Sequence, residues 1–446
     1  MLVESRKTDY KSVLQYVAKG CNFQIFKFSN LQIIKSSNHQ IFKSSNLNIV
    51  LPISKSIANR LLILGRDAVS GIPACDLPHD VAVMQRALMY QPSMADTVTV
   101  DIEDCGTAMR FLTAYFAVMP SNVQLTGTDR MKQRPIAPLV DALRQLGADI
   151  QYAEKEGFPP LVIKGRYLKG GVAHIRGDVS SQFVSALMLV SHLTEYGITV
   201  NILPPVVSSP YIRLTQAVID DPMFPLEADW SSAAFWYEYA AINGKKPVHL
   251  LDLSFDSLQP DSVAVQLFEQ LGVVSEPTEC GIMLQPTGNV CKSLEWDFTG
   301  CPDLYPAVVA TCHALNIDTH FSGLQTLRLK ESDRIEAMSQ GLKQISEFRI
   351  QNSDFNPQPS TFTFSQPSTL NSQLLSTLNN SQPSTLNPQQ LSTLNSQLST
   401  YSDHRIVMAL AMINAAKGLP LPQSLLHSEA VTKSYPHFWK DLEENY

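Results

Sequence analysis

One short stretch of the chain, RLKESDRIEAM at residues 328–338, gathers side chains that could perform acid–base and anion-binding chemistry. A carboxylate that lies among cations and away from water can serve as a general acid or base, which makes Glu331 a candidate. Lys330 and Arg334 stand on either side of it in the sequence, and cations at a helix start suit a phosphate or a carboxylate. The chemistry that these residue types could perform is proton transfer beside a bound anion.

The residues around this stretch predict the elements that must position it. The preceding TLRLK, residues 326–330, alternates polar and apolar residues in the manner of a half-buried strand. Apolar residues then recur at helical spacing, at Ile335, Met338, Leu342 and Ile345. Asp333 followed by Glu336 fits a capping box, which would satisfy the free amides of the first helical turn. Taken alone, the stretch therefore favours a structural role.

The same junction, a polar turn that leads into an apolar helical pattern, recurs along the chain. After the strand-like LNIVLPI come Ser54, Lys55 and Ser56, and then a helix that carries Arg60. Gly106, in DCGTAMRFLT, stands where a backbone could approach a ligand closely. Other junctions place polar residues at or near a predicted helix start, namely Arg134, Ser180, Ser181, Gln182, Asp229, Asp303 and Asp403. Strand, polar turn and helix, repeated in this way, predict an α/β fold built from similar units.

Length and composition limit the class of protein. A chain of 446 residues can bury large cores, and two large domains are the default expectation. No apolar run approaches the ~18 residues that indicate a membrane span, and the N-terminal residues do not resemble a secretory signal, so we expect a cytoplasmic protein. The formal net charge of -7 argues against a nucleic-acid partner. The seven cysteines include no C-x-x-C pair, so we expect reduced thiols and no metal site.

Lysine, arginine and serine residues at the junctions indicate the substrate class. Their local excess on an acidic chain, to which Lys433 near the C-terminus adds, suits one or two small polyanionic substrates. Each junction alone has a structural explanation at least as good as a functional one, so only their combination indicates a site. The chain has no Walker lysine motif and no G-x-G-x-x-G, so neither a nucleoside triphosphate nor a dinucleotide is expected. Asp303 and Glu331 are then the carboxylates available for proton transfer.

Two tracts of short repeats interrupt this order. Residues 355–402 carry no charged side chain, and STLN recurs there at Ser368, Ser376, Ser384 and Ser392. This composition predicts a mobile surface insertion. Near the N-terminus, KFSNLQII, KSSNHQIF and KSSNLNIV follow one another from Lys27. We expect the last copy to form an ordered strand and the others to be decoration.

Ten motifs in a fixed order carry a resemblance to a known family. They are KSIANR, CGTAMRFLT, LTGTDRMKQRPIAPLVDALRQLGA, VSSQFVSALM, SSPYIRLT, DWSSAAF, PDLYPA, LKESDRI, SDHRIVMALA and KSYPHF. In these motifs the chain resembles the 5-enolpyruvylshikimate-3-phosphate synthases, from Pro52 to the end without the repeats. The resemblance implies transfer of the enolpyruvyl group of phosphoenolpyruvate to the 5-hydroxyl of shikimate 3-phosphate, with release of phosphate and without a metal or organic cofactor.

The resemblance also implies a domain organisation. It predicts a two-domain enolpyruvyl transferase fold, in which each domain contains three βαβαββ units and the substrates bind in the cleft between the domains. The first, discontinuous domain would comprise residues 1–54 and 229–446, with the repeat at 26–50 and the insertion at about 355–400. The second domain would comprise residues 55–228. We expect a monomer that binds two small-molecule substrates and neither nucleic acid nor membrane.

Residue roles follow from the motifs of the family. The resemblance implies contacts to shikimate 3-phosphate from Lys55, Ser56, Arg60, Ser180, Ser181, Gln182, Ser208, Tyr211, Asp303 and Lys330. It implies contacts to phosphoenolpyruvate from Lys55, Gly106, Arg134, Gln182, Arg334, Arg405 and Lys433. Asp303 resembles the base near the attacking hydroxyl and Glu331 the acid that protonates the methylene carbon, with Lys55 as a third catalytic residue.

The chain departs from the family pattern at several places. Ile53 replaces a small residue before Ser-Lys-Ser, and Asp104-Cys105 replaces the more common Asn-Ala before Gly106. Both lie near the expected active centre and affect the expected substrate affinity. The stretch from Tyr211 to Asp229 is short, as if a strand pair were missing, which could expose a sheet edge.

Three other functions fit parts of the sequence. A related transferase acts on UDP-N-acetylglucosamine, but the residues from Lys330 to Arg334 and around Gly106 follow the shikimate pattern. A degenerate binder of phosphorylated metabolites is compatible with the shortened segment, although every matched catalytic position is filled. A repeat-mediated interaction protein would require the uncharged tract to fold or bind a partner.

Overall fold

The structure of the protein is a computed structural model that describes residues 47–90, 96–178, 180–204, 206, 209–352, 401–419, 421, 425 and 428–445. Ser208, the insertion expected at about 355–400 and the N-terminal repeats before residue 47 lie outside the described residues. The expectation of a strand in the last N-terminal repeat is confirmed, because β1 spans Leu47–Val50.

Two four-stranded sheets share one topology. The first has the strand order β1-β8-β10-β9, with β8 at Val248–Leu251, β9 at Leu271–Thr278 and β10 at Gly281–Val290. The second has the order β2-β3-β5-β4, formed by β2 (Val98–Asp101), β3 (Ser121–Thr126), β4 (Asp149–Tyr152) and β5 (Leu161–Gly165). In each sheet the first two strands are parallel and the other pairings are antiparallel.

Each of these sheets completes a βαβαββ unit. In the second sheet, α4 (Gly106–Val118) connects β2 to β3, and α5 (Asp129–Lys132) and α6 (Ala137–Gln145) connect β3 to β4. In the first sheet, α9 (Trp230–Asn243) precedes β8, and η2 (Pro260–Val263) and α10 (Ala264–Gln270) precede β9. The predicted repeat unit therefore occurs in full twice in the described part of the chain.

Two further groups of elements begin the same pattern and contain one parallel strand pair each. In one, β6 (Gly171–Arg176), α7 (Ser181–Val190), η1 (Ser191–Leu193), β7 (Ile198–Leu203) and α8 (Ser209–Asp220) follow one another. The other contains β11 (Ser293–Asp297), η3 (Pro302–Leu304), α11 (Tyr305–Leu315), β12 (Asp318–Ser322), η4 (Gln325–Leu329) and α12 (Arg334–Asn352). Between α8 and α9 the described chain has no strand, only an isolated bridge from Ala228 to Ile53. The short spacing before Asp229 thus corresponds to a unit without its last strand pair.

The remaining described helices complete the fold. They are α2 (Lys55–Ile63), α3 (His79–Leu88), α14 (His404–Ala416), η5 (Glu429–Lys433) and α15 (Phe438–Asn445). Among the described residues, no helix is both long and apolar enough to cross a membrane.

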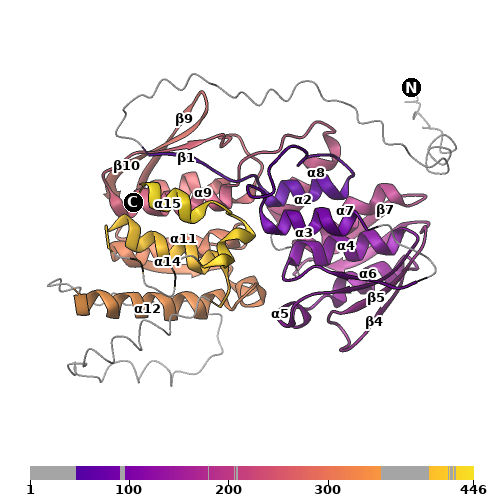
Figure 1. The fold of residues 1–446 in the computed structure, drawn as a ribbon. Helices are drawn as coiled ribbons and strands as arrows, with labels where there is room; N and C mark the ends of the chain where they lie inside the picture. Colours follow the sequence, from indigo (N-terminus) through magenta and orange to yellow (C-terminus); the bar gives the residue numbers. More distant parts are fainter. Residues whose placement is uncertain are drawn as a thin grey trace. The chain divides into compact units, whose positions relative to one another are not determined.

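Buried central helices hold the polar junctions in place. Every residue of α14 is buried, and α9, α11 and α14 pack against one another in one large core (Figure 1). The other large core is built around α4 and α7, whose apolar side chains include Phe111, Phe116 and Phe183. A helix that is apolar on all sides is fixed by its surroundings, so the polar residues at its N-terminal end have rigid positions.

The strand predicted for TLRLK is wrong. Gln325–Leu329 is a 3-10 helix, and the strand of this segment is β12, which ends at Ser322. The alternation covers only two apolar residues, and Leu329 is 57% exposed while Leu327 is buried. So short a pattern does not distinguish a strand from a short 3-10 helix.

Candidate active site

Arg334, the first residue of α12, connects three carboxylates. Its Nε lies 2.9 Å from Oδ2 of Asp403, its Nη1 2.7 Å from Oδ1 of Asp303, and its Nη2 2.7 Å from Oε2 of Glu331. The side chain is 1% exposed. A planar guanidinium is suited to such fixed, multiple hydrogen bonds, so Arg334 orders the carboxylates around it.

Asp303 is surrounded by cations. Besides Arg334, it contacts Nη2 of Arg405 at 3.2 Å and Nζ of Lys330 at 3.3 Å. Burial alone would raise its pKa, but Arg405, Lys330 and Arg334 outweigh burial and hold the pKa of this carboxyl well below its usual range. The structure therefore holds Asp303 as a carboxylate, the form that a general base requires.

Glu331 lies in a similar environment. Burial alone would raise its pKa, but the charges of Arg334, Arg134 and Lys433 outweigh burial and hold the pKa well below the usual range. Arg130 of α5 donates to the carbonyl oxygens of both Glu331 and Lys330 at 3.0 Å, and so fixes the backbone of this turn. The structure brings Glu331 together with the cations that the sequence analysis grouped around phosphoenolpyruvate.

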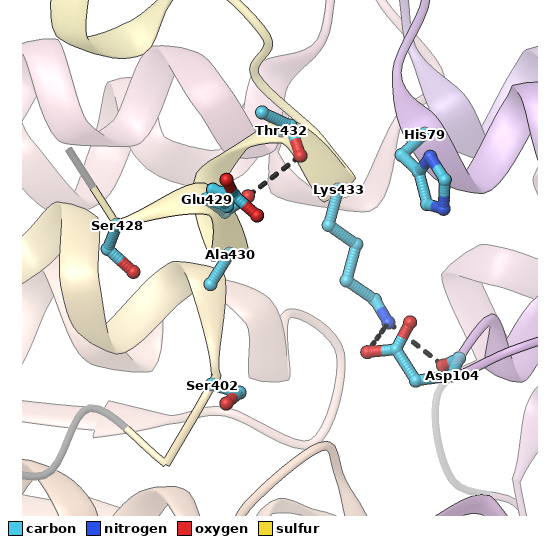
Figure 2. A pocket seen from close by; sticks show the side chains of 8 residues that line it. All are labelled: His79, Asp104, Ser402, Ser428, Glu429, Ala430, Thr432 and Lys433. Carbon is cyan, nitrogen blue, oxygen red and sulfur yellow. Dashed lines mark hydrogen bonds and ion pairs between the residues drawn. The ribbon is translucent and has the colours of Figure 1, made fainter. Parts of the chain in front are cut away.

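A second group of charges surrounds Lys433 of η5. Its Nζ lies 2.6 Å from Oδ2 of Asp104 and 3.6 Å from Oδ1 of Asp80, whose Oδ2 lies 3.1 Å from Nζ of Lys55. Lys433, Asp104 and His79 line a pocket of about 670 Å³. Figure 2 shows Lys433 and Asp104 pointing toward each other. Burial lowers the pKa of Lys433, but Asp80, Glu331 and Asp104 outweigh it and raise the pKa, so this lysine is charged.

Helix starts also place several uncharged site candidates. Ser180 accepts from the amide of Gln182 at 3.3 Å, and Nε2 of Gln182 donates to Oγ1 of Thr107 at 3.1 Å. At Gly106, the first residue of α4, an added Cβ would lie 2.7 Å from Nη1 of Arg134. The glycine is therefore needed for the guanidinium of Arg134 to lie against this helix start.

Other predicted residues have contacts of a more structural kind. Arg60 is buried, and it donates to Oγ1 of Thr215 at 2.9 Å and to the carbonyl of Ser56 at 2.7 Å. Burial lowers the pKa of Arg60 to about 10. Burial, together with Asp261 and Asp303, raises the pKa of Tyr211 well above its usual range, so this tyrosine is a neutral hydrogen-bonding group. Ser181 is also buried, at the start of α7.

Helix capping explains part of the charged stretch: Asp333 caps the helix as expected, while Glu336 bonds to Gln340 within the helix instead of closing the predicted capping box. Oδ1 of Asp333 accepts from the amides of Ile335 at 3.2 Å and Glu336 at 3.3 Å. The carboxylate of Glu336 accepts from Gln340 at 2.6 Å. Asp333 therefore caps α12, while Lys330, Glu331 and Arg334 participate in the charged cluster.

Three residues have a larger role than sequence analysis gave them. Asp80 was not singled out, although a lone acidic residue on an apolar helix face, as in HDVAVM, is a usable signal. Arg130 stands inside the motif LTGTDRMKQRPIAPLVDALRQLGA without a predicted role, and Asp403 is predicted only at a helix start. Asp403 accepts from Arg334 and, at 3.0 Å, from Oγ of Ser332, which fixes the orientation of the guanidinium. Among the described residues, no group of three or more His, Cys, Asp and Glu side chains could hold a metal ion.

Cations gathered around two ionised carboxylates, in this α/β fold, are typical of an enzyme with small-molecule substrates. The chain belongs to the EPSP synthase (3-phosphoshikimate 1-carboxyvinyltransferase) family, whose model matches residues 79–222 and 220–442. This finding confirms the family resemblance of the sequence motifs.

Individual proteins support the same assignment. A 3-phosphoshikimate 1-carboxyvinyltransferase of Bacteroides fragilis (strain YCH46) is 37% identical, over 89% of this chain and 94% of that protein. One of Haemophilus influenzae (strain PittEE) is 30% identical, over 89% and 95%. A solved structure of EPSP synthase from Acinetobacter baumannii has a TM-score of 0.59 at 20% identity, and covers 89% of this chain and 95% of that one. The two-domain α/β fold class predicted from the sequence is confirmed.

Proposed function

We propose that the chain transfers the enolpyruvyl group of phosphoenolpyruvate to the 5-hydroxyl of shikimate 3-phosphate and releases phosphate, in the shikimate pathway to chorismate and the aromatic amino acids. The observation that carries this proposal is the arrangement of Asp303 and Glu331 on one buried arginine, Arg334. The family and the names of the relatives support the same reaction.

The cations of the site are proposed to bind phosphoenolpyruvate. Arg134, Arg334, Arg405, Lys433 and Lys55 would hold its phosphate and carboxylate, with Gln182 and the helix start at Gly106. Support comes from their convergence: Arg334 and Arg405 both contact Asp303, and Arg134, Arg334 and Lys433 all act on Glu331. Such preorganised cations stabilise the negative charge of the leaving phosphate.

Shikimate 3-phosphate is proposed to contact a second set of residues, which shares Lys55 and Gln182 with the first. They are Lys55, Ser56, Arg60, Ser180, Ser181, Gln182, Ser208, Tyr211, Asp303 and Lys330. The neutral hydroxyl of Tyr211 and the junctions at Ser56 and Ser180 suit a polyhydroxylated, phosphorylated substrate. The contacts of Arg60 to Thr215 and Ser56 favour a positioning role for this residue.

Proton transfer is assigned to the two carboxyl groups. Glu331 would protonate the methylene carbon, which gives the central carbon cationic character, and the 5-hydroxyl would attack that carbon while Asp303 takes the hydroxyl proton. The tetrahedral intermediate would then lose phosphate as the methyl carbon returns its proton to Glu331. The proton on Asp303 would leave with the phosphate, so that protons and electron pairs balance.

The low pKa of Glu331 sets a condition for this mechanism. An acid must be protonated before it can act, whereas Arg334, Arg134 and Lys433 keep this carboxyl ionised. Phosphoenolpyruvate would bring its own negative charges to these cations and offset their effect. Substrate binding is therefore proposed to raise the pKa of Glu331 and to bring a proton into the site.

We propose domain boundaries between residues 54 and 55 and between 228 and 229. Support comes from the separate cores: Ile49, Leu51 and the apolar residues from Ala228 onward form one cluster, and residues from Ile63 to Val190 form another. We also propose that the chain is a cytoplasmic monomer. The six described cysteines are free thiols, and one chain supplies all cations and carboxylates of the site.

The test is phosphate release by the purified chain with both substrates in the presence of chelator, with the organic product identified by mass spectrometry. The proposal predicts release that requires both substrates and a product that carries the enolpyruvyl ether. Transfer to UDP-N-acetylglucosamine instead, or binding without turnover, would contradict it. The second outcome would identify a non-catalytic binder.

A further inference from the structure

The contact between Lys433 and Asp104 is close but accessible. Nζ of Lys433 lies 2.6 Å from Oδ2 of Asp104 and donates to the backbone oxygen of Asp104 at 2.8 Å. The lysine side chain is 5% exposed and that of Asp104 is 38% exposed. Both residues line the pocket of Figure 2, so the carboxylate can leave the lysine without unfolding its surroundings.

The charges around this contact balance one another. Lys55 and Lys433 contribute two positive charges, and Asp80 and Asp104 contribute two negative charges. Asp80 is buried between the two lysines and has 4% exposure, so it is a fixed part of the group. Asp104 is the more exposed of the two aspartates and can move away. While its carboxylate remains in place, the group of two lysines and two aspartates has no net positive charge to attract an anion.

The backbone at Asp104 is anchored independently of its carboxylate. Sγ of Cys105 accepts from the amide of Ala108 at 3.4 Å and caps α4, and the amide of Cys105 donates to the carbonyl of Ile102 at 3.0 Å. An asparagine at position 104 would therefore keep the fold of this turn and the backbone contact to Lys433. Only the negative charge would be lost.

We propose that Asp104 is a specificity-determining residue that sets the affinity for phosphoenolpyruvate, because its carboxylate occupies Lys433 and must be displaced when an anionic group of that substrate binds there. This inference rests on the proposed function. Asp104 competes with the substrate for one cation and takes no part in bond making, so it acts on the KM for phosphoenolpyruvate rather than on proton transfer. Lys433 is fully charged in either case, because Asp80 and Glu331 also raise its pKa.

The test compares Asp104→Asn with the adjacent control Glu103→Gln. Glu103 carries the same charge one residue away, but it pairs with His79 and Arg86, each at 2.6 Å. We expect Asp104→Asn to lower the KM for phosphoenolpyruvate roughly three- to tenfold. The lower end corresponds to an ion pair at the surface, and the upper end to a pair that is partly buried. The KM for shikimate 3-phosphate should stay unchanged in both variants, and Glu103→Gln should leave both constants unchanged.

Each outcome decides the proposal. An unchanged or raised KM for phosphoenolpyruvate in a folded Asp104→Asn protein would overturn it, and so would an equal decrease in Glu103→Gln, which would indicate an effect of net charge alone. A second measurement, calorimetric titration with inorganic phosphate, does not depend on turnover. If the wild-type chain shows no turnover, the proposed function fails, and tighter phosphate binding by Asp104→Asn still supports the competition at Lys433 while equal binding refutes it.

Discussion

Nη1 of Arg334 lies 2.7 Å from Oδ1 of Asp303, and this contact joins the segment before α11 to the first residue of α12. Because the same guanidinium binds Glu331 and Asp403, one side chain fixes both carboxyl groups to which we assign proton transfer. The geometry of the proposed chemistry therefore depends on a planar, multiply bonded cation rather than on positive charge alone.

Replacing Arg334 by lysine tests this dependence. Lysine keeps the charge but cannot bridge three carboxylates, so Glu331 and Asp403 could not both keep their buried cationic partner. We expect kcat/KM for phosphoenolpyruvate to fall about 100-fold and the free energy of unfolding to fall by about 2–4 kcal/mol. Steady-state kinetics and urea unfolding measure both effects. Arg328→Lys, at an exposed pair with Asp333, is the matched control and should change stability by less than about 0.5 kcal/mol.

Replacing Arg130 tests whether this residue positions Lys330 and Glu331, which lie far from it in the sequence. Its two hydrogen bonds to the carbonyls of Lys330 and Glu331 hold the turn that presents both side chains. We expect Arg130→Gln to lower kcat about tenfold or more through misplacement of Glu331 and to raise the KM for shikimate 3-phosphate through misplacement of Lys330, with little change in the KM for phosphoenolpyruvate. Lys132→Gln is the control, because Lys132 pairs with the exposed Glu154. Equal kinetics for both variants would show that the turn needs no such support.

A methyl group at Gly106 tests the contact with Arg134. The added Cβ would lie 2.7 Å from a flexible guanidinium, so the arginine would move and the backbone would not. We expect Gly106→Ala to raise the KM for phosphoenolpyruvate about tenfold while the free energy of unfolding stays equal or rises slightly, since alanine favours helix. An unchanged KM would place Arg134 outside the substrate contacts.

Because the pKa of Asp261 is raised, we expect the free energy of unfolding to depend on pH. Burial, first of all, and then the charge of Asp303 raise its pKa to about 7, while Arg405 and the hydrogen bond from Ser231 act in the opposite direction. The folded state therefore holds a proton that the unfolded state has lost above its usual pKa of 3.8. The contribution of Asp261 to the free energy of unfolding therefore falls as the pH rises from about 4 to about 7, and the loss is complete above that range.

The variant Asp261→Asn should remove this loss, because the amide carries no charge and its oxygen can still accept from Ser231. Relative to the wild type, we expect a gain on the order of 2–4 kcal/mol in unfolding free energy at pH 8 and little change at pH 4. Urea unfolding at both values measures it, with the exposed Asp256→Asn as control. A gain of equal size at both pH values would argue against titration of Asp261.

The sequence predicted those parts of the site that are contiguous. Lys330, Glu331 and Arg334 share one turn, and Ser180, Asp229 and Asp403 open helices whose apolar pattern is clear, so local rules were sufficient. The contacts of Asp80 and Arg130 could not be found in this way, although the lone acidic residue of HDVAVM is a local signal for Asp80. Their partners lie far along the chain, and those of Arg130 are backbone oxygens, which have no sequence signature.

For the fold, too, sequence patterns predicted some local features and did not predict the contacts between distant segments. The short connection before Asp229 indicated that a strand pair is missing, and β6 and β7 indeed form a two-stranded sheet on which Val172 and Leu203 are exposed. The incorrect strand at TLRLK came from a pattern of five residues, too short to distinguish a strand from a 3-10 helix. Which charged residues contact one another followed only from the packing of the buried helices.

The central claim is that Asp303 and Glu331 transfer the protons. Single-turnover phosphate release with both substrates, by the wild type, Asp303→Asn and Glu331→Gln, tests it most directly, with the exposed Asp318→Asn and Glu336→Gln as controls. The account predicts that each site variant loses about 10²–10⁴-fold in rate while both controls retain the wild-type rate. Site variants that release phosphate as fast as the wild type would contradict it.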